Sequence, residues 1–247
     1  MRKDRLVRPE GRAEVDQAHF DGTTDLGQAC RFCLRREGAL FRDLTDEEIS
    51  RFGQMQIADL GFLPGDVLYR QGDPGQAVYM IRDGLVKLEQ FLPDGSQRIV
   101  RLARGGAAIA LEVLLGGDCE HQAVALQPTR VCRLPREVLL RIEGETPRLH
   151  RQLMAFWHAS VSEADTWLTL LSTGSARTRV ARLLLLLSEE GDSFEMLSRE
   201  DIGAMLGITT ETASRTIAEF RRAGNLRPVG VRRFAVDRGA LAGISGT

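Results

Sequence analysis

Short apolar runs, broken by glycine and by Pro-Asp pairs, follow one another between residues 63 and 134. They recur at roughly ten-residue intervals, the spacing of short strands joined by turns in an antiparallel barrel or jelly roll. Asp94-Gly95 stands between two such runs and is a strong hairpin signal. We therefore predict an antiparallel β-barrel domain over residues 30–146, with a pair of cysteines at its N-terminal end.

The apolar period becomes helical after Pro147 and stays helical to about Ser172. One face carries apolar or small residues spaced alternately three and four apart: Met154, Trp157, Val161, Ala164, Leu168 and Leu171. This is the heptad spacing with which two helices pack against each other. We call these six residues the seam.

A second apolar stripe, Leu149, Leu153 and Phe156, lies on another face of the same helix and is expected to pack on the barrel. Two apolar faces favour a homodimer over the alternative, a single amphipathic helix lying on its own domain. Residues 147–173 are therefore predicted to form a dimerisation helix.

Residues 197–224 carry the spacing of a helix-turn-helix. Ser198 and Thr209 are suitable N-caps for two helices, and Gly207 ends the first because it adopts a left-handed conformation easily. Ala213 is small enough for the helices to cross closely. The second helix of this motif enters the major groove of DNA.

Polar side chains gather at the N-terminal end of that second helix. Glu211, Ser214 and Arg215 share one face, and these residue types can contact cytosine, several bases and guanine respectively. The alternative is an ordinary surface ion pair between Glu211 and Arg215. Thr209 and Thr210 add hydroxyls that suit a groove and favour DNA contact.

The charge distribution supports a local rather than a general affinity for DNA. The chain has 33 basic and 34 acidic residues, a net charge of −1, so a nucleic-acid surface must be a patch. Residues 199–238 hold eight arginines against five acids, and Arg199 and Arg221 suit phosphate contacts. Residues 225–236 predict a small β-hairpin, a wing. We predict a winged helix-turn-helix domain over residues 174–247, with double-stranded DNA as its partner.

Other classes of protein fit less well. No apolar run approaches the roughly 20 residues that span a bilayer. Residues 1–29 are polar, lack a signal-peptide core and are predicted to be a flexible arm. We expect a cytoplasmic protein without a membrane partner. Barrel enzymes that hold a metal use several histidines, and only His121 falls in the predicted barrel, so an enzyme is not expected.

The order of barrel, long helix and winged helix-turn-helix resembles the CRP–FNR family of bacterial transcription regulators. LPGDVLYRQGDPGQAVYMIRDGLVKL, residues 63–88, is similar to that family's barrel signature, and Glu211-x-x-Ser214-Arg215 matches the recognition pattern of its FNR branch. The resemblance runs from Cys30 to the end of the chain. It implies an α+β fold, with a barrel like cyclic-nucleotide-binding domains.

The same resemblance implies a TTGAT half-site in an inverted repeat, and RNA polymerase as a protein partner. Arg215 would read guanine, Glu211 the opposing cytosine and Ser214 a neighbouring thymine.

Family members that bind cyclic nucleotides hold the phosphate with a Gly-Glu pair and an Arg-Ser pair. Ala110-Leu111 and His121-Gln122 stand at these positions here. Burying a phosphodiester without its guanidinium partner is costly. No cyclic nucleotide is expected, with a shifted pairing through Glu112 as the alternative.

The four cysteines resemble the FNR branch, whose members carry an oxygen-labile [4Fe-4S] cluster. Cys30 and Cys33 form an N-terminal C-x-x-C, and Cys132 lies in the last predicted barrel strand. The family's remaining N-terminal cysteine would fall at Ala39. The fourth ligand therefore stays open among Cys119, His19, His121, an acidic residue and a non-protein group.

Cys119 is the less expected ligand. A hairpin over residues 119–132 that turns near Pro128 pairs Cys132 with Ala125, which leaves Cys119 ~20 Å away along a strand. A dithiol switch at Cys30 and Cys33, a zinc site and cysteines without a role are the alternatives to a cluster.

The sequence thus predicts a sequence-specific DNA-binding transcription regulator that responds to oxygen or redox state as a homodimer. The alternative is a regulator of the same architecture with a small-molecule or constitutive input and no cluster.

Overall fold

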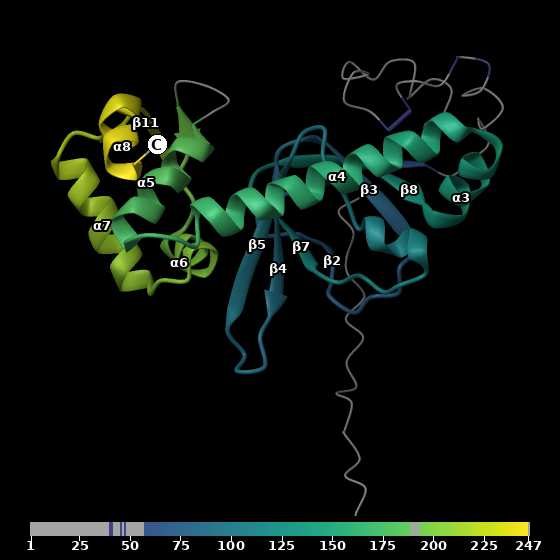
Figure 1. Cartoon of the computed structure of the whole chain (residues 1–247), viewed down its shortest axis with the longest axis horizontal. Helices are drawn as coiled ribbons and strands as arrows, with labels where there is room; N and C mark the ends of the chain where they lie inside the picture. The colour runs from purple at the N-terminus through teal and green to yellow at the C-terminus, as the bar shows by residue number, and fades with distance from the viewer. Residues whose placement is uncertain (1–39, 42–44, 46, 48–56, 189–192, 247) are drawn as a thin grey trace, which may run out of the picture.

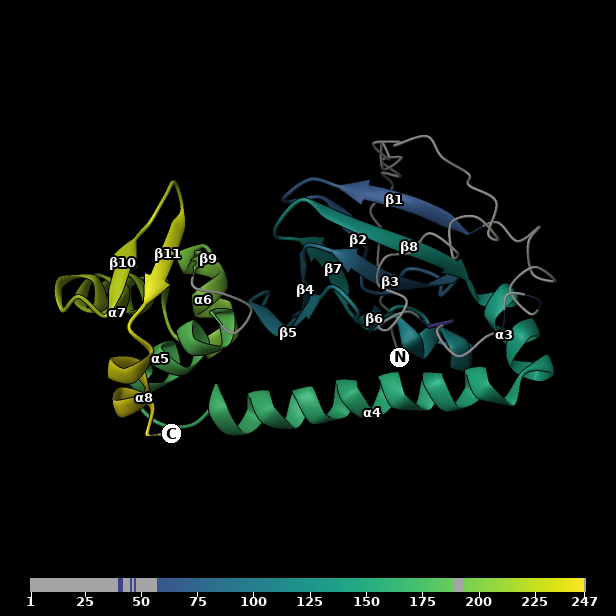
Figure 2. The same ribbon diagram turned by 90° about the horizontal axis from the view of Figure 1, so that it is seen from above.

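The computed structural model describes residues 40–41, 45, 47, 57–188 and 193–246. The N-terminal arm, Cys30 and Cys33 lie outside the described residues. The described part forms a β-barrel domain and a C-terminal helical domain, joined by one long helix that runs beneath the barrel in Figure 2 and ends at the C-terminal domain. The predicted α+β fold, with barrel, long helix and winged helix-turn-helix in that order, is confirmed.

Two four-stranded antiparallel sheets build the barrel. The first has the order β1 (Ala58–Phe62), β8 (Thr129–Pro135), β3 (Ala77–Asp83), β6 (Ala108–Ile109). The second has the order β2 (Val67–Tyr69), β7 (Gln122–Ala125), β4 (Leu85–Phe91), β5 (Gln97–Arg104). Between β6 and β7 lies the short 3-10 helix η2 (Leu111–Leu115).

The β4–β5 connection is the predicted hairpin. The strands pair from Leu85 opposite Arg104 to Phe91 opposite Gln97. Gly95 in the turn has a φ of 81°, a left-handed value that glycine adopts without a steric penalty. The Asp94-Gly95 signal therefore placed this turn correctly.

The predicted pairing of Cys132 with Ala125 is wrong. β7 pairs with β2 and β4, whereas β8 pairs with β1 and β3, so Cys132 stands opposite Asp59 and Met80. The turn at Pro128 carries the chain from one sheet to the other instead of closing a hairpin. The ~20 Å separation of Cys119 from Cys132, which used hairpin geometry, therefore loses its basis.

Two helices follow the barrel, α3 (Arg136–Glu145) and α4 (Pro147–Leu170). Leu149 and Leu153 of α4 are buried in the barrel core, and Phe156 packs against it. The prediction that this stripe packs on the barrel is confirmed. Among the described residues, no helix is long and apolar enough to cross a membrane.

The C-terminal domain is a helix-turn-helix with a three-stranded sheet. Its order along the chain is α5 (Ala176–Leu187), β9 (Phe194–Glu195), α6 (Arg199–Leu206), α7 (Thr210–Arg222), β10 (Leu226–Pro228), β11 (Arg233–Val236), α8 (Arg238–Ser245). The sheet order is β10-β11-β9. Figure 1 shows the helices of this domain gathered at the far end of α4.

The two domains share apolar surface where they meet. Leu85 of β4 and Ile99 and Leu102 of β5 are buried in the core cluster of the C-terminal domain, together with Trp167 of α4. Residue by residue along β4, Val86 and Leu88 face the barrel core while Leu85 faces the other way. The outer face of the second sheet is therefore the surface on which the C-terminal domain packs.

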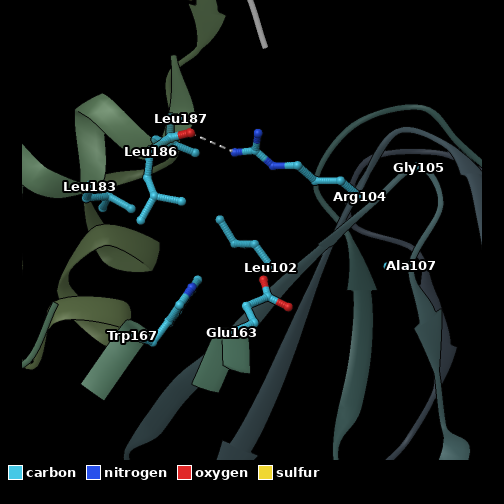
Figure 3. Close-up of a pocket in the computed structure, with 9 residues that line it drawn as sticks. All are labelled: Leu102, Arg104, Gly105, Ala107, Glu163, Trp167, Leu183, Leu186 and Leu187. Carbon is cyan, nitrogen blue, oxygen red and sulfur yellow. Dashed lines mark hydrogen bonds between the residues drawn. The ribbon is translucent and has the colours of Figure 1, made fainter. Parts of the chain in front are cut away.

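A cavity of about 270 Å³ remains at this junction, between β5, α4 and α5. In Figure 3 the guanidinium of Arg104 reaches across it, donating a hydrogen bond to the carbonyl of Leu186 at 3.3 Å. Glu163 lies on the facing side, and burial raises the pKa of its carboxyl. The other lining residues are Leu102, Gly105, Ala107, Trp167, Leu183 and Leu187.

Candidate DNA-binding interface

The helix-turn-helix begins and ends at the predicted residues. The Ser198 hydroxyl accepts a hydrogen bond from the Asp201 amide at 2.9 Å and caps α6, and Thr209 caps α7 in the same way through the Thr212 amide at 3.1 Å. Gly207 ends α6 with a φ of 62°. Local hydrogen bonding and the left-handed glycine therefore set where α6 ends and where each helix begins.

Small residues let α6 and α7 approach closely. Ala213 is fully buried, as expected. Gly203 inside α6 was not singled out from the sequence, yet a Cβ there would lie 2.8 Å from the Ile208 carbonyl oxygen. A glycine within a helix that is otherwise well formed was the available signal.

The predicted recognition residues form one exposed face at the N-terminal end of α7. Thr209, Thr210, Glu211, Ser214 and Arg215 are all exposed. In the described part of the chain, Glu211 and Arg215 make no ion pair with each other. Their donors and acceptors are therefore available to an external partner, as contact with base edges requires.

The two predicted phosphate-contacting arginines are near enough for the charge of one to affect the other. The pKa of Arg199 is lowered by burial and then by the neighbouring charge of Arg221. Arg221 is exposed and lies over the Phe234 ring of the wing at 5.9 Å. An anion such as a phosphate near both guanidinium groups would relieve this repulsion.

The wing is present, formed by β10 and β11. Arg227, Arg232 and Arg233 on it are exposed, and Arg232 has a φ of 59°, a left-handed value that is uncommon for a residue with a side chain. Arg232 lies 3.5 Å from a carboxylate oxygen of Glu195. The wing thus extends the arginine-rich surface beyond the recognition helix.

Five of the six seam residues on α4 are at least partly exposed, and one is buried. Met154, Val161 and Leu168 are exposed large apolar residues, Ala164 is exposed too, and Trp157 is half-buried against the barrel core. Leu171 does not belong with them, because it is only 1% exposed and lies inside the core of the C-terminal domain. The reason is that the C-terminal domain packs against this end of α4 and covers Leu171, the helix C-cap, together with Trp167 one turn earlier.

The two described cysteines differ in environment. Cys119 is buried, and burial followed by the charge of Glu112 raises the pKa of its thiol to about 11. Cys132 is half-buried and packs at the boundary of the barrel core. Since a thiolate is the metal ligand, Cys132 is the better suited of the two. Within the described residues, no group of three potential ligands lies together.

The positions that hold a cyclic phosphate in other proteins carry different chemistry here. Ala110 adopts a left-handed φ of 59° just before η2, and Gln122 donates to Glu89 at 2.7 Å. Burial lowers the pKa of His121; the charge of Glu112 opposes this shift, and the charge of Arg101 adds to it. Arg101, a guanidinium near this site, was not singled out from the sequence. That no cyclic nucleotide binds stays a prediction.

A winged helix-turn-helix with an exposed arginine-rich face, attached to this type of barrel, defines a DNA-binding transcription regulator rather than an enzyme. Residues 60–143 match a family profile described as the cyclic nucleotide-binding domain, and residues 178–244 match the Crp-like helix-turn-helix domain. The chain belongs to the CRP–FNR family of regulators.

Relatives of established function share this architecture along their length. The fumarate and nitrate reduction regulatory protein of Salmonella typhi is 27% identical over 225 residues, which cover 88% of this chain and 90% of that protein. The transcriptional activator protein anr of Pseudomonas aeruginosa is also 27% identical, with coverages of 88% and 92%. The structure of FixK2 from Bradyrhizobium japonicum superposes with a TM-score of 0.70 at 26% identity, covering 78% of this chain and 99% of FixK2.

Proposed function

We propose that the protein binds a TTGAT-type inverted repeat as a homodimer and that oxygen or redox state controls this binding through Cys30, Cys33 and Cys132. The observation that carries the DNA-binding part is the exposed face of Glu211, Ser214 and Arg215 on α7. In this proposal Arg215 reads guanine, Glu211 the opposing cytosine and Ser214 a neighbouring thymine. Arg199 and Arg221 contact phosphates and position the helix.

Exposed apolar residues on α4 support the homodimer. A continuous stripe of exposed apolar side chains, unlike single ones, marks an interaction surface, and Met154, Val161 and Leu168 recur with the heptad spacing of two-helix packing. Two copies joined there present two recognition helices, as a palindromic operator demands. For a DNA-binding transcription regulator of this family, we propose RNA polymerase as the protein partner and the cytoplasm as the location.

Arg215→Ala and Arg221→Ala should separate base reading from phosphate contact. Arg215→Ala is expected to cost about 1–3 kcal/mol on the operator and to relax the preference at the guanine, whereas Arg221→Ala should weaken all duplexes alike and reduce the salt dependence. Titrations against the operator, a guanine-substituted operator and a scrambled duplex measure both effects. Equal discrimination by Arg215→Ala and the parent would contradict the proposed role.

The cysteines carry the proposed input. The FNR-branch resemblance and the half-buried position of Cys132 support a [4Fe-4S] cluster held by Cys30, Cys33 and Cys132, with a fourth ligand outside this set. A cluster bound there would supply iron that reacts with oxygen. The protein would contribute thiolate ligands. Cys119 is poorly suited to this role, because the raised pKa of its thiol disfavours the thiolate.

Serine substitutions test this input, with Cys119→Ser as the matched control. Cys30→Ser and Cys132→Ser should abolish any difference in operator affinity between anaerobic and air-exposed protein, while Cys119→Ser should preserve it. Iron and acid-labile sulfide in the anaerobically purified protein distinguish a cluster from a dithiol switch. If all three variants and the parent bind equally with and without air, the regulator has a small-molecule or constitutive input.

A further inference from the structure

A chain of four polar side chains crosses the junction between the barrel and the C-terminal domain. Gln122 of β7 donates to Glu89 of β4 at 2.7 Å, and the Lys87 ammonium lies 2.9 Å from the other oxygen of Glu89. The same ammonium donates to Asp201 of α6 at 2.8 Å. Lys87 therefore lies between one carboxylate from each domain.

These charges are shielded from water. Glu89 is only 2% exposed, and Lys87 and Asp201 are largely covered as well. A buried carboxylate without a partner is strongly destabilising, so Glu89 depends on the ammonium. Burial lowers the pKa of Lys87, but the hydrogen bond to Asp201 and the nearby charge of Glu89 outweigh it and the net pKa is raised. The ammonium stays charged at neutral pH.

Asp201 connects this chain to the helix-turn-helix. One of its carboxylate oxygens accepts from the Ser198 hydroxyl at 2.6 Å, at the N-cap of α6, and the other accepts from Lys87. The residue that completes the cap of α6 is thus also the residue that holds α6 on β4. Displacing Lys87 would remove this polar contact between the first turn of α6 and the barrel.

The choice of lysine is unusual for this chain. Of its 33 basic residues only Lys3 and Lys87 are lysines. A lysine ammonium is a compact charge with three donors, which suits two carboxylates at 2.8 and 2.9 Å from a single nitrogen. The planar guanidinium of arginine is larger and favours bidentate contact with one carboxylate.

We propose that Lys87 is a positioning residue for DNA binding, one that fixes the placement of α6, and hence of the recognition helix α7, on the barrel. Leu85, Ile99 and Leu102 provide apolar contact at the same junction, but such contact is not directional. The hydrogen-bonded charges select one arrangement. This inference rests on the proposed reading of two half-sites, since their fixed spacing demands a fixed placement of α7.

The test uses the full-length dimer and variants that do not leave the deeply buried Glu89 as an unpaired charge. Lys87→Met combined with Glu89→Gln removes the ammonium together with the carboxylate that needs it, and Asp201→Asn keeps an oxygen for Ser198. The double variant and the Asp201→Asn variant should each lower operator affinity about tenfold. The triple variant should lower it by little more than either one, because the two sets of substitutions break the same contact. Amide hydrogen exchange in α6, measured without DNA, should accelerate in each.

Arg82→Met is the matched control, because Arg82 pairs with Asp59 at 2.6 Å within the barrel and should leave operator affinity and exchange in α6 unchanged. Affinity for scrambled duplex and its salt dependence should not change in the Lys87 variant, since Lys87 neutralises no phosphate. Unchanged exchange in α6, or costs that simply add, would overturn the proposal. A parent protein that does not prefer the operator would instead overturn the proposed function, while the exchange experiment still tests the contact.

Discussion

The double variant Val161→Asp with Leu168→Asp is expected to be monomeric and to lose operator affinity on the order of a hundredfold or more. Both side chains are exposed in the single chain, so charges there should leave the protomer folded. Across a two-helix seam they would place like charges against each other in an apolar environment. Analytical ultracentrifugation and operator titration measure the two effects.

Ala159→Asp with Thr166→Asp is the control for this experiment. These positions are also seven residues apart on α4 and exposed, but they lie off the seam. The control should remain dimeric with parental affinity for the operator. If the two double variants have the same mass and affinity, the seam is not the dimer contact.

Leu171→Ala is expected to destabilise the protein by about 2–5 kcal/mol, the cost of a large cavity in a packed core. Leu171 is almost completely buried with Trp167 of α4 and Val180 of α5, so it anchors the end of the long helix in the C-terminal domain. Leu115→Ala, the same substitution at a leucine that is 82% exposed, should change stability by no more than about 0.5 kcal/mol.

Chemical denaturation measures this difference as a shift of the midpoint at constant slope. A Leu171 variant as stable as the Leu115 variant would mean that the junction does not contribute to folding. A reduced slope would instead indicate that the C-terminal domain separates from α4 before the barrel unfolds.

The helix-turn-helix could be predicted closely because its signals are local. Ser198, Gly207 and Thr209 act on residues no more than four positions away, so the residue type almost determines the conformation. The β4–β5 hairpin was predictable for the same reason. The exposure of the recognition face followed from the helical period alone.

The errors arose where a pattern has two structural meanings. A heptad identifies a helix face but not what covers it, and at the end of α4 the C-terminal domain of the same chain covers Leu171. The sequence signal of a turn at Pro128 is the same whether the turn closes a hairpin or joins two sheets. For this reason Cys132 was paired with the wrong strand. Lys87 and Asp201 are 114 residues apart, so no local signal could have paired them.

The apolar contact of Leu85, Ile99 and Leu102 with the C-terminal core bears on how such regulators can be recombined. A DNA-binding segment excised at Gly174 would leave behind part of the surface that completes its own interior. A graft of this segment onto an unrelated sensor would therefore have to bring along a matching pair of strands. The structural unit that folds around the C-terminal core therefore combines separate segments of the sequence, although the two family profiles divide the chain into consecutive pieces.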